Sequence, residues 1–219
     1  MNLVFLGPPG SGKGTQAAML AKEFNIPTIS TGEALRKEVE LATNIGNLAK
    51  SYMDSGKLVP DNLVVDIIKL RLSKTDCEKG FIVDGFPRNI NQAIVFDNML
   101  NNLGKNINLA INFEVAENVL IKRISGRFSC KDCGTVYNRF FKQTKKENVC
   151  DNCGSNNFES RVDDNEATVK NRLKVYHEST ADLVGYYKKK NLLISLDAVK
   201  NSPLVFEELL KAVSKFLNK

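Results

Sequence analysis

The sequence predicts an α/β protein whose parallel five-stranded sheet is covered by helices on both faces. Five short apolar runs of strand length alternate with longer amphipathic segments. This alternation favours strand–helix–strand crossovers, which pair strands in parallel and lay helices on both sides of the sheet. A glycine-rich turn after the first strand and a cysteine-rich interruption late in the chain are the other two features that shape the prediction.

The expected strands are residues 3–6, 27–30, 81–84, 110–115 and 192–196, and the expected helices include 13–24, 61–73, 90–103 and 116–125. Asp163 with Glu166 three residues later is typical of a capping box, and it predicts a long helix reaching about Tyr187. Ser202 and Pro203 predict the start of the last helix, because proline fits the first helical turn.

The composition is that of a soluble globular protein of one domain with a small insertion. The chain has 219 residues, of which 42% are hydrophobic and 26% charged. The apolar run at residues 1–6 is too short for a signal peptide, and no run approaches the ~18 residues of a membrane span. We therefore expect a cytoplasmic protein whose five cysteines are reduced and form a metal site plus one spare, Cys77.

The formal net charge of +6 is compatible with a nucleic acid or with a small anionic substrate. Between Arg127 and Asp164, around the cysteines, seven Lys or Arg residues face six Asp or Glu residues, so this segment is nearly neutral. We therefore expect no nucleic-acid partner and no membrane partner.

The segment GPPGSGKGT, Gly7 to Thr15, follows an apolar strand and opens a helix, which is the setting of a phosphate-binding P-loop. Its glycines let backbone N–H groups turn toward phosphate oxygens, the helix N-terminus adds partial positive charge, and Lys13 supplies an ammonium group. Gly14 stands where the general pattern has a hydroxyl residue, and Thr15 comes one position later. Whether Thr15 ligates Mg²⁺ directly therefore stays open.

Two Cys-x-x-Cys pairs, separated by sixteen residues, predict a metal site formed by Cys130, Cys133, Cys150 and Cys153. Four thiolates close a tetrahedral site and leave no position for catalysis, so the metal would be structural. Zinc is the commoner occupant, and iron stays an alternative. The segment interrupts the strand–helix alternation, so it is an insertion in the domain.

Six blocks spread over nearly the whole chain resemble the adenylate kinase family. They are the P-loop, TGEALR (31–36), SGKLVPD (55–61), GFIVDGFPRNINQA (80–93), RISGR (123–127) and RVDDNEATVKNRL (161–173). The cysteine segment resembles the zinc-binding lid of the bacterial-type, long-lid form of that family. One departure is Phe128, which stands where many relatives have a second arginine and implies a weaker hold on ATP.

The resemblance implies a P-loop nucleoside monophosphate kinase fold and reversible phosphoryl transfer from Mg-ATP to AMP, giving two ADP. Its parts would be a core (1–29, 60–126 and 164–219), an AMP-binding segment (30–59) and a zinc-ribbon lid (127–163) that closes over an arginine-rich site. The partners would be ATP, AMP and ADP, the cofactors Mg²⁺ and structural Zn²⁺, and the protein a monomer.

The resemblance also assigns residues to roles. The catalytic group would comprise Lys13, Asp84, Arg88, Arg123, Arg161 and Arg172, with Asp84 positioning Mg²⁺ through water and Arg123 and Arg127 holding the ATP phosphates. ATP would be bound by Gly10, Ser11, Gly12, Lys13, Gly14, Thr15, Arg127, Val136, Tyr137 and the backbone near Lys200. AMP would be bound by Thr31, Arg36, Lys57, Leu58, Val59, Gly85, Phe86, Pro87, Arg88, Gln92, Arg161 and Arg172. Gln92 would offer a donor and an acceptor to the adenine edge.

Two alternatives remain at the level of sequence. A kinase for UMP or CMP would share the chemistry, but the four-cysteine lid with Thr31 and Gln92 favours AMP. A P-loop ATPase with a nucleic-acid-binding ribbon would need a basic, aromatic-rich ribbon. Tyr137, Phe140 and Phe141 give it slight support, but the nearly neutral charge of the ribbon and the matched arginines count against it. A phosphate acceptor is already ionised and needs no general base, in keeping with a chain whose one histidine, His177, is expected mid-helix.

Overall fold

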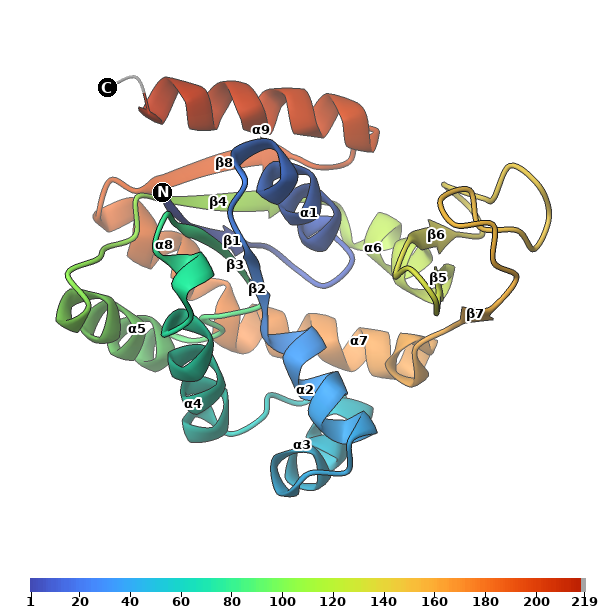
Figure 1. Cartoon of the computed structure of the whole chain (residues 1–219), viewed down its shortest axis with the longest axis horizontal. Helices are drawn as coiled ribbons and strands as arrows, with labels where there is room; N and C mark the ends of the chain where they lie inside the picture. The colour runs from blue at the N-terminus through green and yellow to red at the C-terminus, as the bar shows by residue number, and fades with distance from the viewer. Residues whose placement is uncertain (218–219) are drawn as a thin grey trace.

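The computed structural model describes residues 1–217 and contains a five-stranded sheet in which every neighbouring pair is parallel (Figure 1). The strand order is β2-β3-β1-β4-β8, which confirms the predicted sheet. The strands are Asn2–Leu6 (β1), Thr28–Ser30 (β2), Phe81–Asp84 (β3), Leu109–Glu114 (β4) and Leu193–Asp197 (β8). The carboxyl ends of these strands share one edge, where open α/β sheets bind ligands.

Helices separate consecutive strands of the main sheet, and those expected at residues 13–24, 61–73, 90–103 and 116–125 are present as α1, α4, α5 and α6. The helices are Lys13–Phe24 (α1), Thr31–Glu40 (α2), Asn44–Asp54 (α3), Asp61–Leu72 (α4), Ile90–Asn102 (α5), Glu117–Ser125 (α6), Glu166–Val175 (α7), Asp182–Lys189 (α8) and Ser202–Leu217 (α9), with short turns at Thr75–Cys77 (η1) and Val162–Asp164 (η2). Between α7 and α8 lies a π-helical segment, Tyr176–Thr180 (η3). None of the helices in residues 1–217 is long and apolar enough to cross a membrane.

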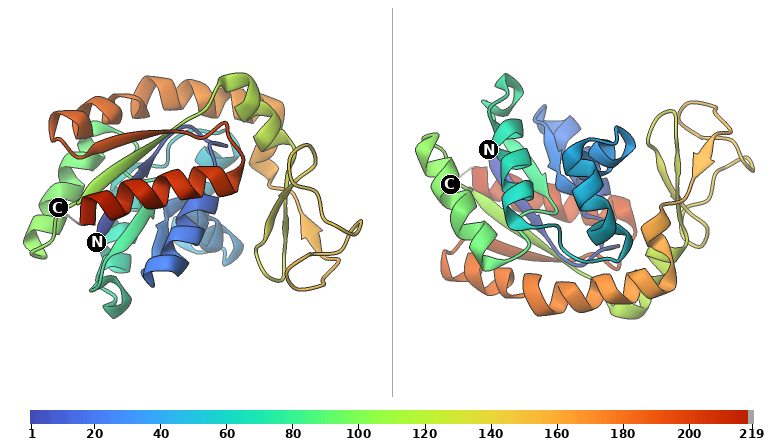
Figure 2. Two further views of the ribbon diagram at one scale, coloured as in Figure 1. Left: turned by 90° about the horizontal axis from the view of Figure 1, so that it is seen from above. Right: turned by 90° about the horizontal axis from the view of Figure 1, so that it is seen from below.

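Two buried clusters, one on each face of the sheet, form the core. Along β1, Leu3 and Phe5 join the cluster under α1 and α9, whereas Val4 and Leu6 join the cluster under α4, α5 and α8. This follows from the two-residue period of a strand, which sends successive side chains to opposite faces. Figure 2 shows α9 on one side of the sheet and α5 with the α7–α8 run on the other.

The predicted helix from residue 163 to about Tyr187 is wrong in two respects. The N-cap is Asn165, whose side chain accepts a hydrogen bond from the Thr168 N–H at 3.0 Å, and Asp163 lies before the helix and pairs with Arg172. Asparagine caps a helix as well as aspartate does, so Asp163 is free to pair with an arginine. The helical run is also not regular, because η3 separates α7 from α8.

The cysteine-rich insertion forms a small antiparallel sheet of its own that projects from the rest of the molecule between α6 and α7 (Figure 1). Its strands are Arg127–Cys130 (β5), Val136–Asn138 (β6) and Phe158–Glu159 (β7), in the order β6-β5-β7. A second segment, containing α2 and α3, lies on the other side of the same edge of the main sheet. Both segments therefore flank the carboxyl ends of the strands.

Candidate active site

The glycine-rich loop runs from the end of β1 to the start of α1 and has the backbone that its sequence predicts. Gly10 has φ 80° and Gly12 has φ 94°, both in the left-handed region that favours glycine. A Cβ on Gly10 would also lie 2.6 Å from Cγ1 of Ile124. The loop therefore needs glycine at both positions, and it delivers the N-terminus of α1 to the edge where the parallel strands end.

Lys13 lies against this loop. Its Nζ donates hydrogen bonds to the carbonyl oxygens of Gly7 at 2.7 Å and Pro8 at 2.8 Å. Burial lowers the pKa of Lys13 to about 8, and the nearby carboxylate of Asp84 opposes that shift. An ammonium group held in such surroundings gains strongly from an added anion, as a phosphate-binding lysine should.

Asp84 ends β3 directly beside the P-loop strand, since Phe5 and Asp84 are register partners. A Cβ built on Gly14 would lie 3.4 Å from Oδ2 of Asp84. Glycine at position 14 therefore leaves that side of the carboxylate free of a covering side chain. An oxygen ligand in this position suits a hydrated Mg²⁺, which prefers carboxylate and phosphate oxygens.

Five arginines form one connected group of charges: Arg36, Arg88, Arg127, Arg161 and Arg172. Arg88, Arg127 and Arg172 act on Lys13, and Arg36 and Arg161 join the group through Arg127. Burial lowers the pKa of Arg88 to about 10, with a further contribution from the positive charge of Arg172. Burial likewise lowers the pKa of Arg161 to about 10, with Arg127 contributing next. Like charges gathered in a partly buried place disfavour one another unless an anion joins them, so the cluster fits a polyanionic ligand.

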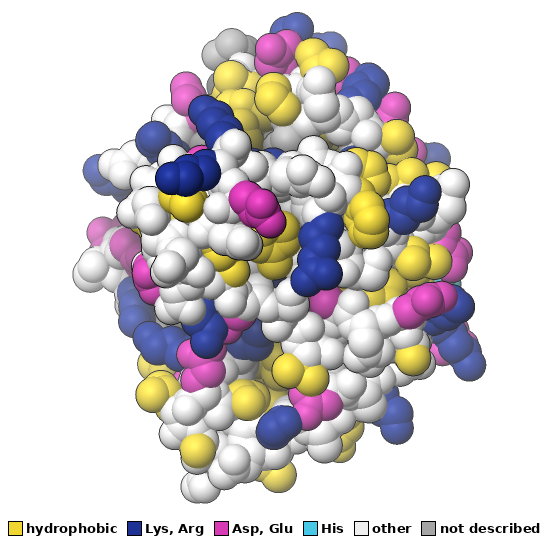
Figure 3. All heavy atoms as spheres, turned by 90° about the vertical axis from the view of Figure 1, so that its right-hand side faces the viewer, with side chains coloured by type: hydrophobic (Ala, Val, Ile, Leu, Met, Phe, Trp, Pro, Cys, Tyr) yellow, Lys and Arg dark blue, Asp and Glu magenta, His cyan; other side chains and the backbone are white. Residues whose placement is uncertain are grey.

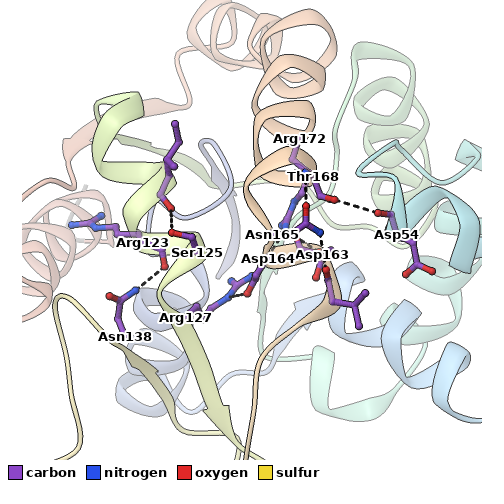
Figure 4. A network of polar contacts seen from close by, with 12 residues as sticks. Asp54, Arg123, Ser125, Arg127, Asn138, Asp163, Asp164, Asn165, Thr168 and Arg172 are labelled. Carbon is purple, nitrogen blue, oxygen red and sulfur yellow. Dashed lines mark hydrogen bonds and ion pairs between the residues drawn. The ribbon is translucent and has the colours of Figure 1, made fainter.

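Two carboxylates hold part of this cluster in place (Figure 4). Asp164 accepts two hydrogen bonds from Arg127, at 2.8 Å from Nε and 2.5 Å from Nη2. Asp163 accepts from Nη1 of Arg172 at 2.8 Å. The sequence prediction did not include either aspartate among the site residues and interpreted Asp163 only as a helix cap. Their position between Arg161 and Arg172 could have indicated that they pair with site arginines.

A pocket beside the arginine cluster contains eight of the twelve residues that the sequence assigns to AMP: Thr31, Arg36, Lys57, Leu58, Val59, Arg88, Gln92 and Arg172. The lining also includes Asp163, Met53 and Val64, which the sequence reading did not name. Gly85 lies next to the pocket, because its carbonyl accepts a hydrogen bond from Thr31 Oγ1 at 2.8 Å. Phe86 is buried in the core behind it, and Phe86, Pro87 and Arg161 are not part of the lining.

The structure turns Arg123 away from the other arginines. Its guanidinium donates to the carbonyls of Ala198 at 2.8 Å and Val199 at 3.1 Å, and Figure 4 shows the side chain pointing away from Arg127. Arg123 therefore lies beside the loop before α9 that contains Lys200. The predicted ATP-base residues also differ in exposure, because Val136 is 38% exposed whereas Tyr137 is 1% exposed and packs inside the lid.

The four lid cysteines form one compact cluster whose sulfur atoms all lie within 4.8 Å of one another. The Sγ atoms of Cys130 and Cys153 are 3.6 Å apart, and those of Cys133 and Cys150 are 3.5 Å apart. A tetrahedral zinc with bonds of about 2.3 Å has sulfur–sulfur edges of roughly 3.8 Å, so the cluster is compatible with zinc. Cys77, the fifth cysteine, is buried in the main core.

The lid has a very small hydrophobic core of its own. Cys130, Tyr137 and Cys150 are its buried members, with Phe128 and Phe158 packed against them. The ring of Phe128 stacks on Tyr137 at 5.5 Å and meets Phe158 edge-on at 5.5 Å. Phe128, where the family resemblance led us to expect a second arginine, thus packs within the lid.

The surface on the lid side of the molecule does not carry a continuous basic band. Figure 3 shows Lys and Arg side chains interspersed with Asp, Glu and hydrophobic side chains on this face. Phe140 and Phe141 are exposed by 64% and 55%. Nucleic-acid binding needs clustered positive charge, so this face gives the ATPase alternative little support.

Comparison with known proteins agrees with this geometry. A family model described as adenylate kinase matches residues 5–192. The chain is 49% identical over 216 residues to adenylate kinase from Methanosarcina barkeri, covering 99% of this chain and 100% of that protein. It is 48% identical to adenylate kinase from Archaeoglobus fulgidus (95% and 96% covered) and 48% identical to that from Caldicellulosiruptor bescii (97% and 99% covered). The chain belongs to the adenylate kinase family.

Proposed function

We propose that the protein catalyses reversible phosphoryl transfer from Mg-ATP to AMP, giving two ADP. The observation that carries the proposal is the five-arginine cluster, which joins the P-loop to the pocket: Arg88, Arg127 and Arg172 act on Lys13, and Arg36, Arg88 and Arg172 line the pocket. Transfer between two phosphates is slow chiefly because two anions must meet in line, and convergent positive charge with fixed positioning removes that obstacle.

Each group has a distinct task in this proposal. The P-loop N–H groups and Lys13 bind the outer phosphates of ATP, while Arg36, Arg88 and Arg172 bind the monophosphate. Arg127 and Arg161 reach the transferring group from the lid side. Arginine suits these tasks because its planar guanidinium grips phosphate through two donors. His177 is exposed on η3 and takes no part.

Two metal ions belong to the proposal. Asp84 would hold Mg²⁺ through water, and Mg²⁺ would neutralise charge that develops on the phosphates. The four lid cysteines would hold Zn²⁺, which replaces the hydrophobic core that the lid lacks. Closing of the lid would bring Arg127 and Arg161 onto the phosphates and exclude water, so that ATP is not wasted by hydrolysis.

The remaining parts of the proposal concern partners and location. The protein would act on ATP, AMP and ADP as a cytoplasmic monomer, with residues 30–59 and 127–163 as its two moving segments. Arg123 would join Arg127 in holding the ATP phosphates, which requires its guanidinium to leave the carbonyls of Ala198 and Val199. Val136, Tyr137 and the backbone near Lys200 would bind the base of ATP.

The proposal is tested by supplying Mg-ATP with AMP, UMP, CMP, GMP or no acceptor and following diphosphate formation. We expect ADP formation that depends strongly on AMP. Faster turnover with UMP or CMP would support the related-kinase alternative and contradict the interpretation of Gln92. Hydrolysis of ATP without acceptor, stimulated by DNA or RNA, would support the ATPase alternative.

Two alanine variants test the residues themselves. Removing one group that stabilises transition-state charge lowers turnover by about 10²–10³-fold, and we expect a loss of that order for Lys13→Ala and for Arg88→Ala. Lys69→Ala is the matched control, because Lys69 is exposed on α4 and lies outside the pocket lining. Turnover of either test variant at the rate of the control would contradict the assignment.

A further inference from the structure

The side chain of Gln92 is held at both ends. Gln92 is 2% exposed and lies in the first turn of α5. Its Nε2 donates to Oδ1 of Asp61 at 2.6 Å, and its Oε1 accepts from the backbone N–H of Arg88 at 2.7 Å. A carboxylate only accepts and a backbone N–H only donates, so these two contacts fix which end of the carboxamide is which.

Asp61 is itself fixed by a neighbour. Nδ2 of Asn89 donates to both carboxylate oxygens of Asp61, at 3.1 and 3.2 Å. The other end of the Asn89 side chain caps α5, because its Oδ1 accepts from the backbone N–H of Gln92 at 2.8 Å. The first residue of α4 and the first turn of α5 are thus joined, and the acceptor that faces Gln92 has a set position.

A carboxamide has two N–H groups and two acceptor lone pairs. Asp61 and the Arg88 N–H use one of each, which leaves one donor and one acceptor for the pocket that Gln92 lines. A donor beside an acceptor matches the edge of a 6-aminopurine, where a ring nitrogen accepts and the amino group donates. A 6-oxopurine presents the reverse order, with a ring N–H and a carbonyl, and would leave buried groups unpaired.

We propose that Asp61 is a positioning residue that sets the preference of this pocket for a 6-aminopurine over a 6-oxopurine. Asp61 is not part of the pocket lining, so it acts through Gln92. Without Asp61 the Gln92 carboxamide keeps only its hydrogen bond from the Arg88 N–H and can exchange the positions of its oxygen and its amino group. The inference rests on the proposed function, in which the pocket binds the base of AMP.

The experiment compares AMP with IMP, which differs in the 6-substituent and the adjacent ring N–H. A hydrogen bond to a charged group contributes a factor of roughly 10 to 100. For Asp61→Ala we expect a rise of about tenfold in KM for AMP and a similar fall in the AMP:IMP ratio of kcat/KM. The KM for ATP and kcat with AMP should stay near the values of the unaltered protein.

The matched control is Asp66→Ala, since Asp66 is an exposed acidic residue of the same helix. It should change none of these constants. Asp61→Asn keeps the size of the side chain but can turn either an oxygen or an amino group toward Gln92. We expect it to lower the AMP:IMP ratio by a smaller factor, about threefold.

A double-mutant cycle with Gln92→Ala separates positioning from a merely structural role. If Asp61 acts through Gln92, adding Asp61→Ala to Gln92→Ala should leave the KM for AMP unchanged. Independent, multiplying effects would overturn the inference, as would an unchanged AMP:IMP ratio in the single variants. If Asp61→Ala does not fold, Asp61→Asn alone decides, because a ratio equal to that of the unaltered protein would overturn the inference. Failure of the unaltered protein to use AMP would instead contradict the proposed function.

Discussion

The two segments that flank the arginine cluster, residues 30–59 and 127–163, are stabilised in different ways. In the first, Leu35, Ala49 and Val59 are buried in the same cluster as the main sheet. In the second, the buried hydrophobic residues are Cys130, Tyr137 and Cys150, which form a separate small cluster. A helical segment packed on the core shares its hydrophobic stabilisation, whereas a projecting insertion needs its own source, which in our proposal is the metal held by the four-cysteine cluster.

The two segments nevertheless share a functional feature, because each contributes an arginine to the same cluster. Arg36 belongs to α2, and Arg127 begins β5. Burial lowers the pKa of Arg36, and Arg127 is among the charges that act on it. In the proposed reaction one segment therefore serves AMP and the other serves ATP, and their separate stabilisation lets each be perturbed alone.

Metal removal should have the largest effect and should be confined to the lid. Structural zinc contributes about 10–16 kcal/mol of apparent binding free energy in small domains, so a chelator should unfold residues 127–163 while the core stays folded. We expect the KM for ATP to rise more than the KM for AMP, because Arg127 and Arg161 lose their positions. Calorimetry and steady-state kinetics before and after chelation check this, with zinc added back to restore activity.

The control for metal removal is Cys77→Ala, which keeps the four-cysteine cluster. It should respond to the chelator as the unaltered protein does. A single melting transition that shifts for the whole protein on metal removal would mean that the lid and the core are one cooperative unit. That result would contradict the separate stabilisation of the lid.

Leu35→Ala should destabilise the whole protein and not one segment alone. Deleting a buried leucine side chain destabilises a protein by about 2–5 kcal/mol, and Leu35 belongs to the main cluster. We therefore expect denaturant unfolding to remain one transition with a lower midpoint. Phe158→Ala, in the small lid cluster, is the matched variant and should leave the core midpoint unchanged. Early unfolding of residues 30–59 alone in Leu35→Ala would contradict the shared core.

The features that sequence reasoning predicted well are local or periodic. The five strands, the P-loop and the paired cysteines each leave a signal within a few residues, because a strand, a tight turn and a metal knuckle are short-range structures. The arginines of the site were found through blocks that resemble a family, and five of the six now lie together. The sequence did not indicate the direction of the Arg123 side chain, because that direction depends on distant partners such as the carbonyl of Ala198.

The features that were missed depend on contacts between distant parts of the chain. The π-helical segment η3 ends at Thr180, whose Oγ1 donates to the carbonyl of Arg88 at 2.7 Å. No local sequence pattern predicts that contact. The pair formed by Asp61 and Gln92 spans 31 positions. In the local sequence, Asp61 is simply an acidic residue in the first turn of a helix. The helix dipole favours a negative charge at that position, so the local pattern gives no sign of the contact with Gln92.

The smallest effect is expected at the junction between residues 30–59 and α7, the helix that follows the lid. Asn171 on α7 donates from Nδ2 to the carbonyl of Ser55 at 2.6 Å. Thr168 donates from Oγ1 to the carbonyl of Asp54 at 3.5 Å (Figure 4). Because α7 follows the lid, these contacts link residues 30–59 to the helix that bears Arg172. Asn171→Ala removes one such hydrogen bond and should destabilise the junction by about 1 kcal/mol. We expect a rise of roughly two- to fivefold in KM for AMP with the KM for ATP unchanged.

The control for Asn171→Ala is Lys170→Ala, because Lys170 is exposed on the same helix. An equal change in both KM values would show that α7 couples the two segments, and their separate stabilisation would then not make them independent in function.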